Sequence, residues 1–187
     1  MRIIAGSAKG AKLLPPHDSA IRPTLDRVRE ACFSIIAPRL EGARFLDLFA
    51  GTGANGLEAL SRGALQADLV DASPAARKII EANAARTRLG DYARIHAFSL
   101  PAGLPKLAKY GPYHLIYADP PHTFTDYVGL FDAIAQAQLL APHGLAILEH
   151  GPKSPVAESY GPFDRVRRAD YGRTSLSVFL TRPPRNP

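Results

Sequence analysis

Two short motifs hold the residues whose types and spacing could support chemistry. The first is a short apolar run, a glycine-rich turn and a helix-forming run, in residues 45–60. Asp47 ends the apolar run, and a second apolar run ends in Asp71, about twenty residues further on. Glycines at 51 and 53 let the backbone take positive φ or approach a ligand closely, and an acid placed like Asp71 accepts hydrogen bonds from ribose hydroxyls. This order predicts a site for a nucleoside-containing cofactor.

Two cofactors fit the first motif. Gly51, Gly53 and Gly56 read as G-x-G-x-x-G, and Asp71 has the offset expected for NAD. The alternative is S-adenosylmethionine (SAM), whose amino acid end is charged and carries no phosphate. Asp47 would repel a pyrophosphate but suits a cationic or amino-bearing ligand. The glycine pattern alone leaves both cofactors open, together with a turn that serves packing only.

The second motif is Asp119-Pro120-Pro121-His122, directly after an expected strand at 113–118. Ligands of open α/β sheets bind at the carboxyl ends of the strands. The prolines stiffen the loop and remove two N–H donors, so the Asp119 carboxylate and nearby carbonyls remain as acceptors. Such acceptors suit the exocyclic amino group of a base, and His122 offers a flat ring for stacking. A dehydrogenase has no use for this loop, so the motif favours SAM over NAD; an ordinary rigid turn is the other interpretation.

The elements that must position these motifs alternate between strand and helix, which predicts an α/β fold with a mostly parallel sheet. We expect seven strands, the last two forming an antiparallel C-terminal hairpin. The expected strands lie near residues 45–48, 67–70, 93–98, 113–118, 144–149, 163–171 and 174–180. The expected helices begin near 57 and cover 25–36, 74–88, 104–108 and 125–140, with Thr24 as N-cap of the first. Residues 1–20 are predicted to form a small basic β-hairpin that precedes the first helix.

Length and composition favour one domain over residues 1–187, with an ordinary core at 46% hydrophobic residues. No apolar run reaches the ~20 residues of a membrane helix, so we expect no membrane association. Cys32 is the only cysteine and lies in a helical pattern, which predicts a core residue and a reducing, cytoplasmic compartment. No cluster of metal-ligating residues with suitable spacing is visible, so no metal is expected. We also expect a monomer.

The net charge of +6 is concentrated at the two ends of the chain. Residues 1–44 carry +4, residues 45–162 carry −2 and residues 163–187 carry +4. This segregation favours a polyanion, such as nucleic acid, that contacts the ends, although basic residues can also simply solvate a surface. The predicted phosphate contacts are Arg2, Lys9, Lys12, Arg22, Arg27 and Arg29.

The motifs together resemble one family, the RsmD-type 16S ribosomal RNA guanine-N2 methyltransferases. Besides the Asp-Pro-Pro motif, the matching segments are residues 2–6 (RIIAG), 22–30 (RPTLDRVRE), 47–53 (DLFAGTG), 56–64 (GLEALSRGA) and 171–174 (YGRT). The resemblance implies a Rossmann-like class I methyltransferase fold and SAM as methyl donor. It implies as target a guanine of 16S rRNA (position 966 in the usual bacterial numbering), within an assembled or assembling small ribosomal subunit.

Two positions depart from the family pattern. The family usually has Phe or Tyr where this chain has His122, and many class I enzymes have an acid where this chain has Phe98 and Ser99. The predicted mechanism is direct transfer to an unpaired or flipped-out guanine. The predicted catalytic residues are Asp119, Pro120, Pro121 and His122. The predicted cofactor-binding residues are Asp47, Phe49, Gly51, Thr52, Gly53, Asp71, Ala72, Ser99 and Asp119.

Three other functions remain open from the sequence. A DNA adenine or cytosine amino-methyltransferase would use the same Asp-Pro-Pro loop. An NAD(P)-dependent oxidoreductase would share the glycine pattern, although the chain leaves little room for a substrate domain. A non-catalytic RNA-binding protein with a vestigial pocket would share the basic ends.

Overall fold

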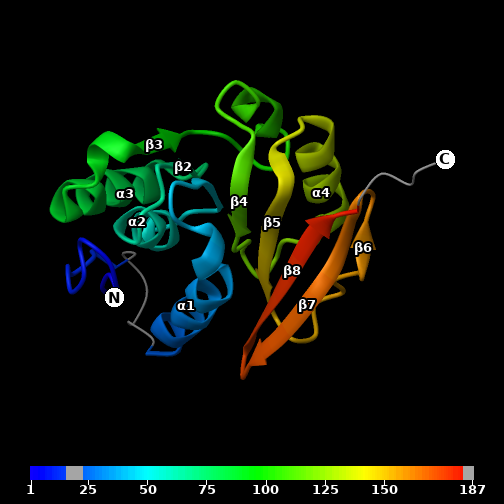
Figure 1. The fold of residues 1–187 in the computed structure, drawn as a ribbon, viewed down its shortest axis with the longest axis horizontal. Helices are drawn as coiled ribbons and strands as arrows, with labels where there is room; N and C mark the ends of the chain where they lie inside the picture. Colours follow the sequence, from blue (N-terminus) through cyan, green and yellow to red (C-terminus); the bar gives the residue numbers. More distant parts are fainter. Residues whose placement is uncertain (16–22, 183–187) are drawn as a thin grey trace.

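The central sheet has eight strands in the order β3-β2-β1-β4-β5-β8-β7-β6 (Figure 1). The computed structural model describes residues 1–15 and 23–182. The strands are β1 Arg44–Leu48, β2 Gln66–Val70, β3 Ala93–His96, β4 Tyr113–Ala118, β5 Leu140–His150, β6 Ser159–Tyr160, β7 Phe163–Tyr171 and β8 Thr174–Thr181. Strands β1 to β5 pair in parallel, and β8, β7 and β6 add antiparallel pairs. The mostly parallel sheet with an antiparallel C-terminal hairpin is therefore confirmed, but the expected strand count of seven was wrong. The eighth strand, β6, has two residues, too few to leave a sequence pattern.

Helices cover both faces of the sheet, because the parallel strands are apolar on both sides. The α-helices are α1 Pro23–Ile36, α2 Ala54–Ser61, α3 Pro74–Thr87 and α4 Tyr127–Gln136, with 3-10 turns at Ala37–Arg39, Gly90–Tyr92 and Leu104–Leu107. Helices α1, α2 and α3 share one apolar cluster with Phe45 and Leu115. Helix α4 shares the other with Leu46 and Ile116. No helix in residues 1–15 and 23–182 is long and apolar enough to cross a membrane.

Two helix boundaries differ from the expected ones for local reasons. Helix α1 begins at Pro23, so Thr24 lies inside the helix and is not its N-cap. Helix α4 begins only at Tyr127, because the Asp126 side chain caps it by accepting the Gly129 N–H at 2.9 Å. It ends at Gln136, and Gln138 takes a left-handed φ of 50°. That turn lets β5 start at Leu140, four residues earlier than the sequence indicated.

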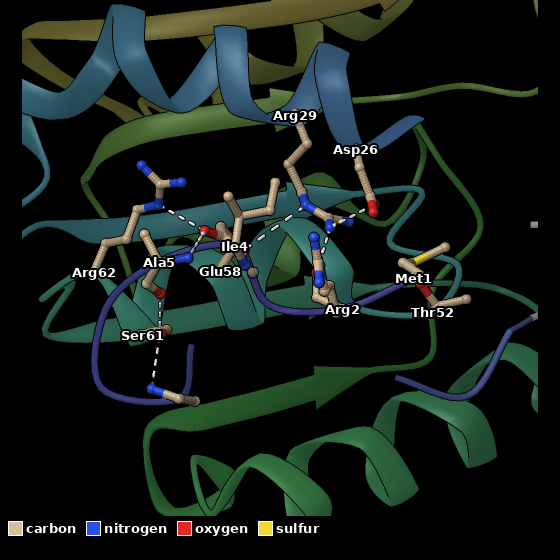
Figure 2. A network of polar contacts seen from close by, with 12 residues as sticks. Met1, Arg2, Ile4, Ala5, Asp26, Arg29, Thr52, Glu58, Ser61 and Arg62 are labelled. Atoms are coloured by element: carbon tan, nitrogen blue, oxygen red, sulfur yellow. Dashed lines mark hydrogen bonds and ion pairs between the residues drawn. The ribbon is translucent and has the colours of Figure 1, made fainter. Parts of the chain in front are cut away.

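The N-terminal segment, residues 1–15, folds back on itself and packs on α2 (Figure 2). Its antiparallel pairing is a single bridge between Arg2 and Lys12, so the expected hairpin is present only in this reduced form within the described residues. Gly6 has a φ of 86°, and an added Cβ would lie 1.7 Å from the Ser61 carbonyl oxygen. Only glycine therefore allows the segment to lie this close to α2.

One buried carboxylate fastens this segment to the rest of the protein (Figure 2). Glu58 of α2 is 0% exposed, and it accepts the N–H groups of Ile4 at 2.8 Å and Ala5 at 3.0 Å. Arg62 pairs with the same carboxylate at 2.7 Å, and Arg29 of α1 lies 3.8 Å from it. Arg29 also donates to the carbonyl of Arg2 at 2.5 Å. The N-terminal segment, α1 and α2 thus meet at one charged network.

The Glu58 network predicts a large loss of stability in Glu58→Ala. The variant leaves the N–H groups of Ile4 and Ala5 and the Arg62 charge without their Glu58 partner, and breaking a buried ion pair costs about 3–5 kcal/mol. Chemical denaturation measures the change in free energy of unfolding. The exposed Glu81 of α3 supplies the control, since Glu81→Ala should change stability by less than about 0.5 kcal/mol. Equal effects of the two substitutions would contradict the anchoring role of Glu58.

Candidate active site

Four carboxylates lie at the carboxyl ends of neighbouring parallel strands. Asp47 is in β1, Asp71 follows β2, Asp119 follows β4 and Glu149 is in β5. Parallel strands end at one edge, so these acids meet at the edge where open α/β sheets bind ligands. The sequence predicted the first three. Glu149 was missed, although it ends the expected strand 144–149 in the same manner as the others.

Two cavities open at this edge, and Phe49 and Asp119 line both. The first, the Asp71 cavity, has a volume of about 500 Å³. It is lined by Phe49, Val70, Asp71, Ala72, Ser73, Phe98, Ser99, Leu100, Asp119 and Pro121. The second, the Gly51 cavity, has a volume of about 170 Å³. It is lined by Met1, Arg29, Phe49, Ala50, Gly51, Thr52, Ala54, Asn55, Tyr117, Asp119 and Glu149.

The glycine turn and Asp71 hold each other at the cavity wall. Gly51 has a φ of 56° and donates its N–H to Asp71 at 2.9 Å, and the Ser73 N–H donates to the other oxygen at 2.8 Å. An added Cβ at Gly51 would meet nothing closer than 3.9 Å, so the backbone is open to a ligand there. Gly53 lines neither cavity. A Cβ on it would lie 3.1 Å from Leu69 and Ile80, so packing and its φ of 75° account for this glycine.

Asp47 lies beneath the turn and lines neither cavity. Its Oδ2 accepts the Gly56 N–H at 2.8 Å, whereas Oδ1 has no partner in the described part of the chain. Burial raises the pKa of Asp47 to about 8, the Gly56 hydrogen bond opposes this rise, and the negative charge of Asp71 adds to it. A buried acceptor without a partner costs free energy unless a ligand satisfies it. Oδ1 therefore keeps unused acceptor capacity beneath the turn, although Asp47 lines neither cavity.

The Asp-Pro-Pro loop presents acceptors, as the sequence predicted. The Asp119 N–H donates to the Leu48 carbonyl at 3.3 Å, and the Pro121 carbonyl accepts the Phe124 N–H at 2.8 Å. The Asp119 carboxylate and the Pro120 carbonyl have no hydrogen bond to residues 1–15 or 23–182. Burial raises the pKa of Asp119 well above its usual range, and Glu149 and then Asp47 add to the rise. His122 is exposed on the same loop.

Three aromatic side chains support this loop, of which the sequence predicted only Phe49 as a site residue. The ring of Phe124 packs edge-on against Phe49, with centroids 5.2 Å apart, and against Tyr127, with centroids 5.8 Å apart. Phe49 has a left-handed φ of 60°, which is uncommon for a bulky residue. Strain of this kind concentrates at functional sites. Here the strained residue is the one whose aromatic ring lines both cavities.

The structure places most of the predicted phosphate contacts at the surface, but not all of them. Arg2, Lys9, Lys12 and Arg27 are exposed, and Arg22 lies outside the described residues. The prediction for Arg29 was wrong: its side chain is 4% exposed and lines the Gly51 cavity instead of the outer surface. Arg29 follows Val28 on the buried side of α1, and its charge is balanced by Asp26 at 2.9 Å and by Glu58. Cys32 lies in the core as predicted, and burial raises the pKa of its thiol.

The strand order, the glycine turn and the Asp-Pro-Pro loop define a class I methyltransferase. The chain belongs to the family described as Conserved hypothetical protein 95, whose model matches residues 1–180. It is 33% identical over 183 residues to the putative rRNA methyltransferase YlbH of Bacillus subtilis, covering 97% of this chain and 100% of that protein. The predicted resemblance to RsmD-type methyltransferases is confirmed.

Two Escherichia coli proteins support the same assignment. Ribosomal RNA small subunit methyltransferase D is 39% identical over 122 residues, which cover 65% of this chain and 60% of that protein. The solved structure of the putative methyltransferase yhhF aligns with a TM-score of 0.83 and 31% identity. This alignment covers 97% of this chain and 98% of that one.

The raised pKa of Asp47 predicts a pH dependence of stability. Between an unfolded pKa near 3.8 and a folded pKa of about 8, the folded state binds more protons than the unfolded state. The free energy of unfolding therefore falls as pH rises through this window, by at most about 1.4 kcal/mol per pH unit. Asp47→Asn keeps an acceptor for the Gly56 N–H and should remove this decline. Denaturation of the ligand-free protein across the window measures it, and Asp91→Asn, at an exposed acid, serves as control.

Proposed function

We propose that this protein is a SAM-dependent methyltransferase that methylates the exocyclic N2 of a guanine in 16S rRNA of the small ribosomal subunit. The observation that carries the proposal is the Asp119 carboxylate, which lines both cavities and has no hydrogen-bond partner among the described residues, followed directly by the Pro120 carbonyl, which has none either. The names of the relatives support rRNA as the substrate. Membership of their family favours methyl transfer over the oxidoreductase that the glycine pattern left open.

The residues of the site divide the work of binding and positioning. SAM supplies a methyl group on a cationic sulfur, and its positive charge favours the ionised forms of the carboxylates around the cavities. Asp71 and the Gly51 backbone bind the ribose side, and the free Oδ1 of Asp47 suits the amino group. Ala72 and Ser99 line the cavity beside Asp71. Positioning of this kind supplies most of the catalysis in a direct transfer.

The Asp-Pro-Pro loop prepares the amino group of the base. The Asp119 carboxylate and the Pro120 carbonyl accept its two N–H hydrogens, which turns the nitrogen lone pair toward the methyl donor. SAM would supply the methyl group to this nitrogen, which must then release one proton. The Asp119 carboxylate lines the cavity where that proton is released and can accept it. The exposed ring of His122 stacks on the base.

Complementation of an Escherichia coli strain that lacks methyltransferase D tests the proposal. Mass spectrometry of its 16S rRNA nucleosides should show N2-methylguanine restored by the wild type and by His122→Phe. Asp119→Ala should abolish it, and in vitro His122→Ala should slow transfer by roughly 5- to 150-fold, the value of about 1–3 kcal/mol of stacking. Asp91→Asn controls for expression. Methylation of a different base, or none by a folded and SAM-binding wild type, would sink the proposal.

The exposed basic residues of the N-terminal segment and α1 should bind RNA through its phosphates. Replacing Arg2, Lys9, Lys12 and Arg27 by Gln should flatten the salt dependence of RNA affinity, by a log–log slope of roughly 0.7–0.9 per lost contact. Affinity for SAM should not change, because none of the four lines a cavity. Lys78→Gln and Lys153→Gln, at exposed lysines in the acidic middle of the chain, provide matched controls. An unchanged slope in the fourfold variant would mean that these charges only solvate the surface.

A further inference from the structure

Glu149 is a buried carboxylate at the site that the transfer described above does not use. Its side chain is 9% exposed, and Tyr117 donates its hydroxyl hydrogen to Oε2. Its other oxygen, Oε1, accepts no hydrogen bond from the residues that the structure describes. Glu149 and Tyr117 both line the Gly51 cavity. One oxygen is thus held by the protein and the second is available to a ligand.

The pairing of β4 with β5 places Glu149 beside the start of the Asp-Pro-Pro loop. Ala118 pairs with Leu148, so Asp119 and Glu149 come next on adjacent parallel strands. Both carboxylates line the Gly51 cavity, and the negative charge of Glu149 contributes to the raised pKa of Asp119. Two carboxylates therefore line one cavity, and the Pro120 carbonyl, next to Asp119 in the chain, is the third acceptor of this region.

Three acceptors match the hydrogen-bond donors on one edge of guanine. Guanine carries a ring N1–H directly beside its N2 amino group, which gives three N–H hydrogens in a row. In adenine and cytosine the ring nitrogen next to the amino group is an acceptor, and its lone pair would face a carboxylate. The Asp-Pro-Pro loop uses the two amino hydrogens and leaves N1–H without a partner. An unpaired buried donor is costly, so a site built for guanine needs a third acceptor.

We propose that Glu149 accepts the N1–H of the target guanine and thereby selects guanine over other amino-bearing bases. This inference rests on the proposed guanine-N2 activity and names the residue that determines its specificity. Tyr117 is the positioning residue, because its hydroxyl fixes the carboxylate and leaves one oxygen directed to the base.

The ionisation of the two carboxylates agrees with this role. Burial raises the pKa of Glu149, but the Tyr117 hydrogen bond and the nearby His122 lower it. Asp119 has no such hydrogen bond, and its pKa is raised well above its usual range. The Tyr117 hydrogen bond thus favours the ionised form of Glu149, which is the state that an N1–H donor requires. The neighbouring charged groups are Asp119 on the loop after β4, His122 on the same loop and Arg29 from α1.

The test compares guanine with 2-aminopurine at the target position of an rRNA substrate. 2-Aminopurine keeps the amino group but has an acceptor at N1. Wild-type kcat/KM should be about 10- to 150-fold lower on 2-aminopurine, the worth of one hydrogen bond to a charged group. Glu149→Gln should lose activity on guanine and narrow this ratio at least tenfold, because its amide can donate to N1. Tyr117→Phe should lower kcat/KM on guanine while the preference for guanine persists.

Each outcome decides the inference. An unchanged ratio in a folded Glu149→Gln protein would show that Glu149 is only a buried partner of Tyr117. If Glu149→Gln fails to fold, the wild type alone still decides, since equal rates on guanine and 2-aminopurine would overturn the role. If the proposed guanine-N2 activity itself is wrong, the result differs, because the wild type would then leave N2 of guanine unmethylated. Glu81→Gln, at an exposed residue of α3, is the matched control for both substrates.

Discussion

Repulsion among like charges at one edge of the sheet is the constraint on which this structure depends. Asp47, Asp71, Asp119 and Glu149 end neighbouring strands, and burial raises the pKa of three of them. The protein tolerates this because backbone N–H groups and the Tyr117 hydroxyl compensate part of the charge. The remaining negative potential favours a cationic cofactor and a base edge rich in donors. The same electrostatic feature thus destabilises the carboxylates and, in the proposed reaction, favours these ligands.

Arg29 shows why the N-terminal segment belongs to the site as well as to the surface. A buried guanidinium needs anionic partners, and Arg29 finds them in Asp26 and Glu58. Glu58 in turn holds the backbone of the N-terminal segment. The exposed basic residues of that segment are therefore fixed relative to the cavities. The residues proposed to bind phosphates and those proposed to bind the base are thus connected through one charged network.

Local patterns predicted the fold well because they have local causes. The apolar runs, the glycine turn and the acid after β2 are each specified by adjacent residues, and all three appear in the structure. Arg29 and Glu149 were misjudged because their roles depend on tertiary contacts. Arg29 looks like an exposed helix residue until Asp26 and Glu58 are placed around it. Glu149 could have been found, since it ends its strand as Asp47 does, but only the β4–β5 register shows that it lies beside Asp119.

The short helix α2 links two distant features. It begins at the glycine turn, with Gly53 as its N-cap, and its middle supplies Glu58 to the amides of Ile4 and Ala5. Those two amides exchange with solvent only when the segment separates from the helix. The hydrogen-exchange rates of these two amides, measured by NMR, therefore report how often the segment separates from α2, the helix that begins at the glycine turn. A ligand that binds at the glycine turn and reduces the motion of α2 would slow amide exchange at residues 4 and 5, although it does not contact them.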